Sequence, residues 1–181
     1  MPGSAEIALF PAQQKARNQL AGLIGARNVV GRTLCCLVGA QGCGKTMLAK
    51  HISSDPEFGE ARRIPVNLLV LDLLRDKYPD IFGFPEPSFR AEIRRWGRSL
   101  QDDVAYLIRE RMLAEGLNVL DHLELLFALR LNPVTMWYAD AVGRRRILLV
   151  ITGRMSGQRC QVGSYTLTRA DQPIVELEET E

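Results

Sequence analysis

Hydrophobic positions along the chain fall into two kinds of run. Short uninterrupted apolar runs are typical of strands buried on both faces of a parallel sheet, and apolar residues repeated every three or four positions indicate helices. The expected strands cover residues 33–38, 64–68, 117–120 and 147–151. The expected helices cover residues 11–26, 45–53, 69–77, 89–113 and 132–142. This alternation predicts an α/β fold, a single domain whose central, mainly parallel sheet carries helices on both faces.

Three local signals refine this outline. Ser88 is a candidate N-cap for the long helix, and Asn132 followed by proline is a typical helix start. Two further stretches, 165–168 and 174–178, alternate like strands around a turn at Asp171. We therefore expect a core over residues 1–156, including an N-terminal helix, and a strand-like extension over residues 157–181 that is not a separate domain.

Composition adds mainly exclusions. The chain has 181 residues, of which 46% are hydrophobic and 24% charged. Its net charge is +2, so we do not expect a protein that coats nucleic acid with a basic surface all round. The four cysteines have no CxxC spacing and the two histidines do not complete a zinc set. No run approaches the roughly 20 apolar residues of a membrane helix, and no signal peptide pattern opens the chain. These features predict a cytoplasmic protein with no membrane association.

One motif carries clear chemistry. Residues 39–46 read Gly-Ala-Gln-Gly-Cys-Gly-Lys-Thr and match G-x-x-x-x-G-K-[ST] at every fixed position, between an apolar strand and a helix. Glycines let such a loop wrap phosphate with backbone N–H groups, and the helix that follows directs its positive end at the anion. Lys45 adds a charge for the β- and γ-phosphates. The nucleotide contacts expected from the motif are Gly39, Gln41, Gly42, Cys43, Gly44, Lys45, Thr46 and Met47.

A magnesium nucleotide needs oxygen ligands beside the loop. Thr46 offers a hydroxyl to Mg²⁺, and Asp121 ends the apolar strand 117–120 at the sheet edge where ligands bind in α/β folds. Asp121 is therefore the expected second acid, acting on Mg²⁺ through water. The expected cofactors are ATP and Mg²⁺. The guanine-reading sequence Asn-Lys-x-Asp does not occur, which favours adenine over guanine.

Candidate catalytic groups follow the same edge. Glu124 could act as the general base that polarises the attacking water, although it stands three residues after Asp121 and His122 occupies the position directly after it. Glu124 is equally compatible with an ordinary first-turn helix carboxylate, and His122 with a partly buried strand-end histidine or a second candidate base. Thr152, at the end of strand 147–151, could sense the γ-phosphate or simply suit a strand.

Arginine clusters raise two further possibilities. Arg144, Arg145 and Arg146 could reach the γ-phosphate of a neighbouring copy, or form a solvated turn. Arg90, Arg94, Arg95 and Arg98 share a helix that could meet nucleic-acid phosphates, although acidic residues nearby dilute its charge and Trp96 is better read as core.

The chain resembles BrxF, the small P-loop protein of type 3 BREX bacteriophage-exclusion systems. The resemblance spans most of residues 33–155. It rests first on the motif at residues 39–46, the P-loop, and on Pro65-Val66-Asn67-Leu68 leading into a leucine-rich helix. It rests further on the 120–127 segment Leu-Asp-His-Leu-Glu-Leu-Leu-Phe, and on the Asn-Pro helix leading into strand 147–151 and Thr152. The fold that we expect is a P-loop NTPase domain, ASCE-like, with an additional strand between the P-loop strand and the Asp121 strand or next to them. The resemblance agrees with this fold. It also implies a phage-defence accessory protein acting beside a methyltransferase and a large ATPase.

These features together predict a slow or partner-stimulated ATPase. The glutamate's displaced position leaves open a nucleotide-gated binding subunit without turnover. A nucleic-acid-associated AAA-like ATPase, a homo-oligomer and a small-molecule kinase also remain open.

Overall fold

The fold is a parallel sheet with helices on both faces. A computed structural model describes residues 8–26, 33–83, 85–141 and 145–178. Its helices are α1 (Pro11–Ile24), α2 (Lys45–Ile52), α3 (Val66–Lys77), α4 (Glu86–Arg109), α5 (Glu124–Ala128) and α6 (Pro133–Trp137), with 3-10 turns at η1 (Pro56–Phe58) and η2 (Pro79–Gly83). The strands are β1 (Thr33–Gly39), β2 (Ala61–Pro65), β3 (Gly116–Asp121), β4 (Arg145–Thr152), β5 (Met155–Ser156), β6 (Arg159–Val162), β7 (Tyr165–Thr168) and β8 (Ile174–Leu177).

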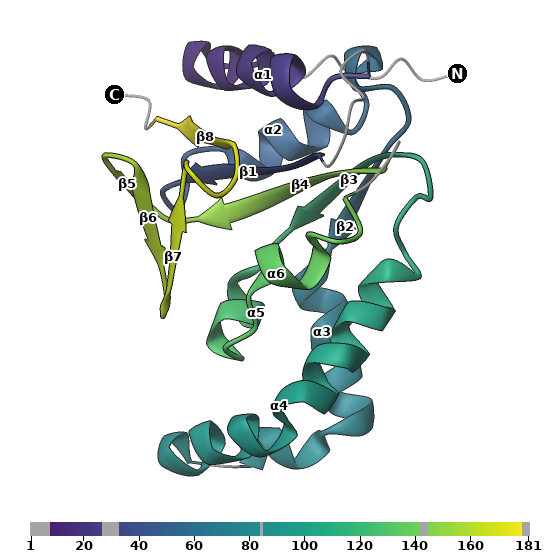
Figure 1. The fold of residues 1–181 in the computed structure, drawn as a ribbon, viewed down its shortest axis with the longest axis vertical. Helices are drawn as coiled ribbons and strands as arrows, with labels where there is room; N and C mark the ends of the chain where they lie inside the picture. Colours follow the sequence, from purple (N-terminus) through teal and green to yellow (C-terminus); the bar gives the residue numbers. More distant parts are fainter. Residues whose placement is uncertain (1–7, 27–32, 84, 142–144, 179–181) are drawn as a thin grey trace.

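The main sheet has the strand order β2-β3-β4-β1-β8, and all its neighbours pair in parallel. β4 therefore lies between β1, which leads into the 39–46 loop, and β3, which ends at Asp121. All carboxyl ends lie at one edge, on the left of Figure 1. That edge is where ligands bind in open α/β sheets.

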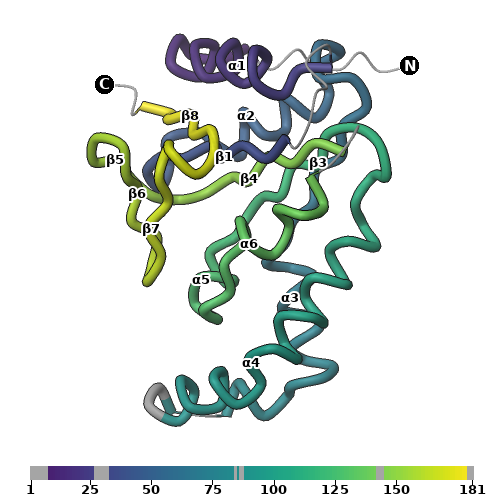
Figure 2. The backbone as a smooth tube through the Cα atoms, viewed as in Figure 1, coloured from purple at the N-terminus to yellow at the C-terminus, as the bar shows by residue number. Residues whose placement is uncertain are grey.

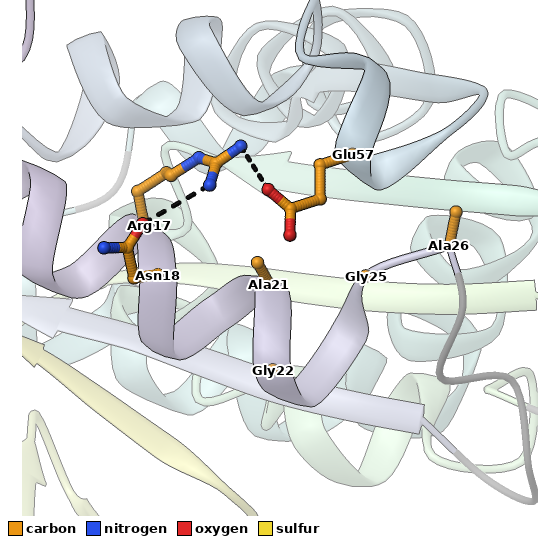
Figure 3. A pocket seen from close by; sticks show the side chains of 7 residues that line it. All are labelled: Arg17, Asn18, Ala21, Gly22, Gly25, Ala26 and Glu57. Atoms are coloured by element: carbon orange, nitrogen blue, oxygen red, sulfur yellow. Dashed lines mark hydrogen bonds and ion pairs between the residues drawn. The ribbon is translucent and has the colours of Figure 1, made fainter.

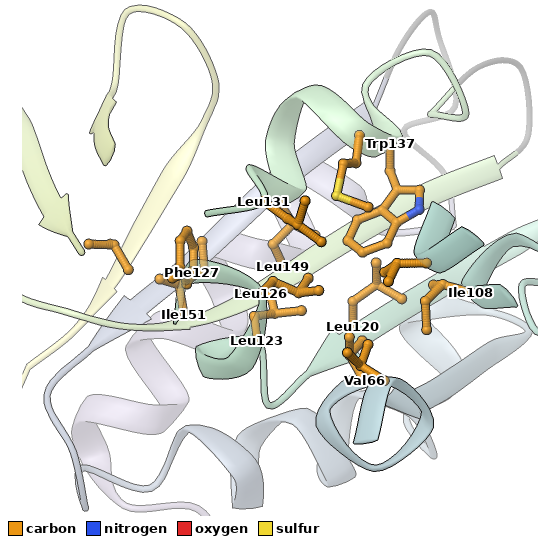
Figure 4. Packing of buried hydrophobic residues seen from close by; sticks show 14 of the residues in the cluster. Val66, Ile108, Leu120, Leu123, Leu126, Phe127, Leu131, Trp137, Leu149 and Ile151 are labelled. Carbon is orange, nitrogen blue, oxygen red and sulfur yellow. The ribbon is translucent and has the colours of Figure 1, made fainter. Parts of the chain in front are cut away.

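Two cores sandwich the sheet. Helices α1 and α2 cover one face, and α3, α4, α5 and α6 cover the other (Figure 1). The pleat explains why the adjacent cysteines of β1 are both fully buried: Cys35 faces the α1 and α2 side, and Cys36 faces the opposite side. Figure 4 shows the second core, where the Trp137 indole packs beside Leu131 and Leu149. Uniformly apolar strands arise because both faces are covered.

A small antiparallel sheet, β5-β6-β7, follows β4. Its Cys160, Val162 and Leu167 join the core on the α5 side, and the rings of Phe127 and Tyr165 lie 6.1 Å apart. The expected pair of strands around Asp171 is thus split: β7 belongs to this sheet, whereas β8 pairs with β1 in the main sheet. The residues after 157 therefore contribute a strand to the main sheet.

Several expected boundaries were wrong. Strand 64–68 is β2 over Ala61–Pro65, and Val66 already begins α3, because pairing with β3 stops at Pro65 opposite Asp121. The long helix starts at Glu86 with Pro85 as N-cap, so Ser88 lies inside it.

The long helix ends at Arg109 and bends at Gly97, where φ is 20° (Figure 2). Asn132 does cap α6, its Oδ1 accepting from the Val134 amide at 3.0 Å, but that helix ends at Trp137 and not at residue 142. Val142 lies outside the described residues.

Candidate nucleotide site

The loop after β1 has the backbone geometry that its glycines predict. Gly42 and Gly44 have φ of 84° and 91°, values that side chains other than glycine rarely adopt. Gly39 has no room for a Cβ, which would lie 2.6 Å from the Cys43 Sγ and 2.9 Å from the Leu177 carbonyl oxygen. Helix α2 begins at Lys45, and its first-turn amides have no partner within the helix. The loop therefore presents a helix start beside tightly packed backbone.

Lys45 is 8% exposed and its ammonium lies over this loop. The Nζ donates to the Ala40 carbonyl at 2.5 Å and lies 3.9 Å from the Cys43 Sγ. A phosphate oxygen entering the loop would compete with that carbonyl for the same ammonium.

Gln13 holds the loop from the other side. This side chain of α1 is 2% exposed; its Nε2 donates to the Gly44 carbonyl at 3.2 Å and its Oε1 accepts from the Phe10 amide at 2.9 Å. A Cβ at Gly44 would lie 2.4 Å from the Gln13 Nε2. Sequence reasoning missed this residue, because only the packing of α1 against α2 brings it to the loop.

Asp121 ends β3 and is 2% exposed. Its Oδ2 accepts from the Arg63 Nε at 2.8 Å and lies 2.7 Å from an Arg63 terminal nitrogen, while its Oδ1 accepts from the His122 amide at 2.9 Å. His122 has a φ of 58°, and its Nε2 lies 3.3 Å from the Arg63 guanidinium. The buried acid is thus held by an arginine from the neighbouring strand, a partner that sequence reasoning did not identify.

Glu124 is held through both carboxylate oxygens. Its Oε1 accepts from the Thr152 hydroxyl at 2.9 Å and its Oε2 from the Asn67 Nδ2 at 3.1 Å. The Asn67 Oδ1 accepts from the Leu125 backbone amide at 3.0 Å, and the Asn67 backbone amide donates to the His122 carbonyl at 3.1 Å. Residues from α3, α5 and β4 therefore meet at one carboxylate. A single polar residue inside the otherwise apolar run 64–71 was the signal that could have identified Asn67.

These groups surround one cavity of about 350 Å³, within the range of small-molecule sites. Its lining consists of Gln41, Gly42, Gly44, Lys45, Thr46, Met47, Asp121, His122, Glu124, Val150 and Thr152. Of the expected contacts, Gly39 and Cys43 lie outside this lining. The two oxygen donors expected for Mg²⁺, Thr46 and Asp121, line the same space.

A second cavity of about 400 Å³ lies between α1 and η1 (Figure 3). Its one arginine, Arg17, is engaged with Asp55 at 2.6 Å and with Glu57 at 2.5 Å. Burial raises the pKa of Asp55, but the hydrogen bonds from the Glu57 amide and the Arg17 guanidinium outweigh it and leave that pKa below its ordinary value. This cavity ends at Ala26, where the described chain stops, and we assign it no ligand.

The two described arginines of the triplet lie at the opposite end of the sheet. Arg145 and Arg146 begin β4, whereas the cavity lies where β4 ends. Arg146 is 3% exposed, donates to the Ile24 and Phe58 carbonyls at 2.6 and 2.7 Å, and has its pKa lowered by burial. Arg145 bonds the Leu113 carbonyl and Asp140. Neither described arginine is a solvated turn residue, and the buried Arg146 cannot reach a neighbouring copy; Arg144 lies outside the described residues.

The arginines of α4 are partly engaged on their own helix. Arg95 pairs with Glu92 at 3.5 Å, and Arg94 donates to the Arg90 carbonyl at 3.4 Å. Trp96 packs against Tyr78 with ring centroids 5.1 Å apart, at the margin of the core.

Comparisons with known proteins add no identity. No protein-family model matches the chain, and no curated protein matches it. Within the described residues no helix is long and apolar enough to cross a membrane. The same residues contain no group of three or more His, Cys, Asp or Glu side chains arranged to hold a metal.

Proposed function

We propose that the chain is a P-loop NTPase that binds MgATP and hydrolyses it slowly or on stimulation by a partner. The observation that carries the proposal is the shared cavity. Lys45 and Thr46 of the 39–46 loop line it together with Asp121, which ends a strand two positions away in the sheet, and Glu124, which begins α5. Strand β4 lies between β1 and β3, and this order supports the proposal because an ASCE-like P-loop fold has an additional strand at that position.

The donor set fits a magnesium nucleotide. Mg²⁺ takes oxygen ligands and keeps most of its waters, so one hydroxyl and one carboxylate suffice beside the phosphates. Thr46 would hold the ion directly and Asp121 through water, and the ion would neutralise charge on the phosphates. The loop amides and the Lys45 ammonium bind and orient the phosphate chain.

Glu124 is the base of the proposed reaction. A carboxylate that already accepts from Asn67 and Thr152 is fixed in direction, and it can take the proton of a water that attacks the terminal phosphate. An attacking water must compete with these two donors for the carboxylate oxygens. Slow turnover without a partner follows from that arrangement.

The same contacts support the runner-up function, a nucleotide-gated binding subunit without turnover. Asp121 is engaged by Arg63 and Glu124 by two donors, so nucleotide binding could act through these contacts alone. A role as a cytoplasmic accessory subunit of a BREX phage-defence complex is part of the proposal and rests on the resemblance.

Nucleotide binding by the Lys45→Ala variant tests the proposal. Fluorescent ATP should bind the natural chain in the presence of Mg²⁺ and lose at least tenfold in affinity with Lys45→Ala, since a charge-assisted contact to phosphate is removed. Lys50→Ala, an exposed lysine on the same helix, is the matched control. Equal affinity for all three proteins would refute the P-loop assignment. A second measurement, of phosphate release from ATP, separates the two candidate functions. An ATPase releases phosphate and loses that activity with Glu124→Gln, whereas a binding subunit without turnover releases none.

A further inference from the structure

A trough leads away from the candidate nucleotide site along α5. A cavity of about 320 Å³ shares Glu124 and Thr152 with the nucleotide cavity and is otherwise lined by Phe127, Ala128, Val162 and Gly163. A further cavity of about 310 Å³ shares Phe127 and Ala128 with it and extends to Phe89, Arg90, Arg130 and Ser164. Successive cavities thus share wall residues from the P-loop to Arg130.

The middle of the trough is apolar and built to stay open. Ala128 is exposed at its floor, and Phe127 beside it is buried, on the side of the core that faces the small sheet (Figure 4). Gly163, with a φ of 57°, brings the small sheet against α5, where a Cβ would lie 3.6 Å from the Phe127 Cβ. Small residues at these two positions leave room for one apolar side chain.

The far end of the trough carries the positive charge of Arg130. With the Leu131 amide bonded to the Leu126 carbonyl at 2.8 Å, the φ of 59° at Arg130 is that of a residue that ends a helix, and its side chain is exposed. Its amide donates to the Phe127 carbonyl at 3.1 Å, and its carbonyl accepts from the Tyr165 hydroxyl. Among the described residues its guanidinium has no hydrogen-bond or ion-pair partner, so the backbone is held while the charge is left for a ligand.

We propose that this trough binds a segment of a partner protein that carries an apolar side chain next to an acidic residue. The apolar side chain fills the space over Ala128, and the acidic group pairs with Arg130, which can bind a carboxylate through two parallel hydrogen bonds. Nucleic acid fits less well, because Phe127 is only 8% exposed and offers little surface for base stacking.

Occupancy of the trough has a consequence for turnover, and this part rests on the proposed function. The segment would lie against Glu124 and Thr152, whose hydrogen bond fixes the proposed base. A bound partner can therefore change the position of that carboxylate and the rate of hydrolysis, which makes the trough the site of partner stimulation.

Selection of peptides tests the binding part without nucleotide. A phage-displayed random nonapeptide library is selected on the full chain and counter-selected on Ala128→Trp, which fills the trough from an exposed helix position. We expect enriched peptides with Leu, Met or Phe beside Asp or Glu. Synthetic fluorescent copies should bind about tenfold more weakly to Arg130→Glu, because an ion pair is replaced by repulsion. Arg159→Glu, an exposed arginine of β6 that lines none of these cavities, should bind them unchanged.

Three results would overturn the proposal. The first is that no peptides are enriched on the natural chain relative to Ala128→Trp. The second is that the enriched peptides bind Arg130→Glu as tightly as the natural chain. The third is that fluorescent oligo-dT or oligo-U, and not peptides, binds in a way that depends on Arg130. Because the peptides are measured without nucleotide, Lys45→Ala should bind them normally. Peptide binding by a chain that never binds ATP would refute the proposed function and leave the trough assignment standing.

Discussion

The ion pair between Arg63 and Asp121 links folding stability to the proposed metal position. Asp121 is 2% exposed and both of its Arg63 contacts are shorter than 3 Å, at 2.8 and 2.7 Å. Arg63→Met keeps an apolar stem of similar reach but removes the countercharge. Removing one partner of a fully buried pair costs about 3–5 kcal/mol. Because the Arg63 side chain is 24% exposed, water screens the pair, and we expect a loss of about 2 kcal/mol in the free energy of unfolding.

A double-mutant cycle isolates the pair. Asp121→Asn alone should cost about 1 kcal/mol, since the amide oxygen can still accept from the His122 amide. The variant Arg63→Met/Asp121→Asn should be more stable than the sum of the single losses predicts, by about 1 to 2 kcal/mol, because no charge is left buried alone.

Urea unfolding of each variant, followed by circular dichroism at pH 7, measures these values. Millimolar Mg²⁺ should then restore part of the stability of Arg63→Met, whose freed carboxylate is the better magnesium ligand, and not that of the double variant. Arg62→Met, the exposed neighbour in β2, is the control. Additive losses within about 0.5 kcal/mol, or a single variant as stable as the natural chain, would refute the reasoning.

Three further predictions test the site and its surroundings. Glu124→Gln should bind ATP normally and hydrolyse it at least about a hundredfold more slowly, and unchanged phosphate release in this variant would move the base elsewhere. Asn67→Ala, which frees one carboxylate oxygen of Glu124, should change turnover and leave the affinity for ATP within about twofold. Cys43 should be the thiol that reacts with a disulfide reagent in the native chain, since burial raises the pKa of Cys35 to about 12 and the other two cysteines are also buried. MgATP should slow that reaction. Labelling that survives in Cys43→Ala would contradict this prediction. Asp55, whose pKa lies below its ordinary 3.8, should contribute stability that is present above that pH and lost as the pH falls through the lower, folded-state pKa. The stability of Asp55→Asn should therefore fall less steeply than that of the natural chain as the pH drops below 3.8, and an unchanged profile would contradict the shift.

The parts of the fold that local sequence determines could be predicted from it. The glycines of residues 39–46 impose their own backbone conformation, and the apolar runs 34–38 of β1 and 147–151 of β4 are uniform because both faces of the sheet are covered. The boundary between β2 and α3 could not be predicted, since Val66 and Leu68 suit a strand as well as a helix. Pairing with β3, which ends opposite Asp121, decides it.

The candidate site divides in the same way. Lys45, Thr46 and Asp121 follow from a motif and a strand end, and the structure places them around one cavity with Glu124 and Thr152. Arg63 and Gln13 could not be found, because their contacts depend on the parallel register of β2 against β3 and on the packing of α1. The bend at Gly97 was also hidden, since glycine within a helical pattern does not by itself reveal a change of direction.

The position of β8 has a consequence for how the protein is made. Residues 174–177 pair with residues 36–39, so the strand that leads into the phosphate loop gets its outer neighbour from the last described strand of the chain. During translation β1 leaves the ribosome well before β8 and has an unpaired edge until β8 emerges, and closing so long a loop is slow. The nascent chain should therefore complete the support of its 39–46 loop only after residue 177 has emerged. That order would keep shorter nascent chains from binding the proposed nucleotide.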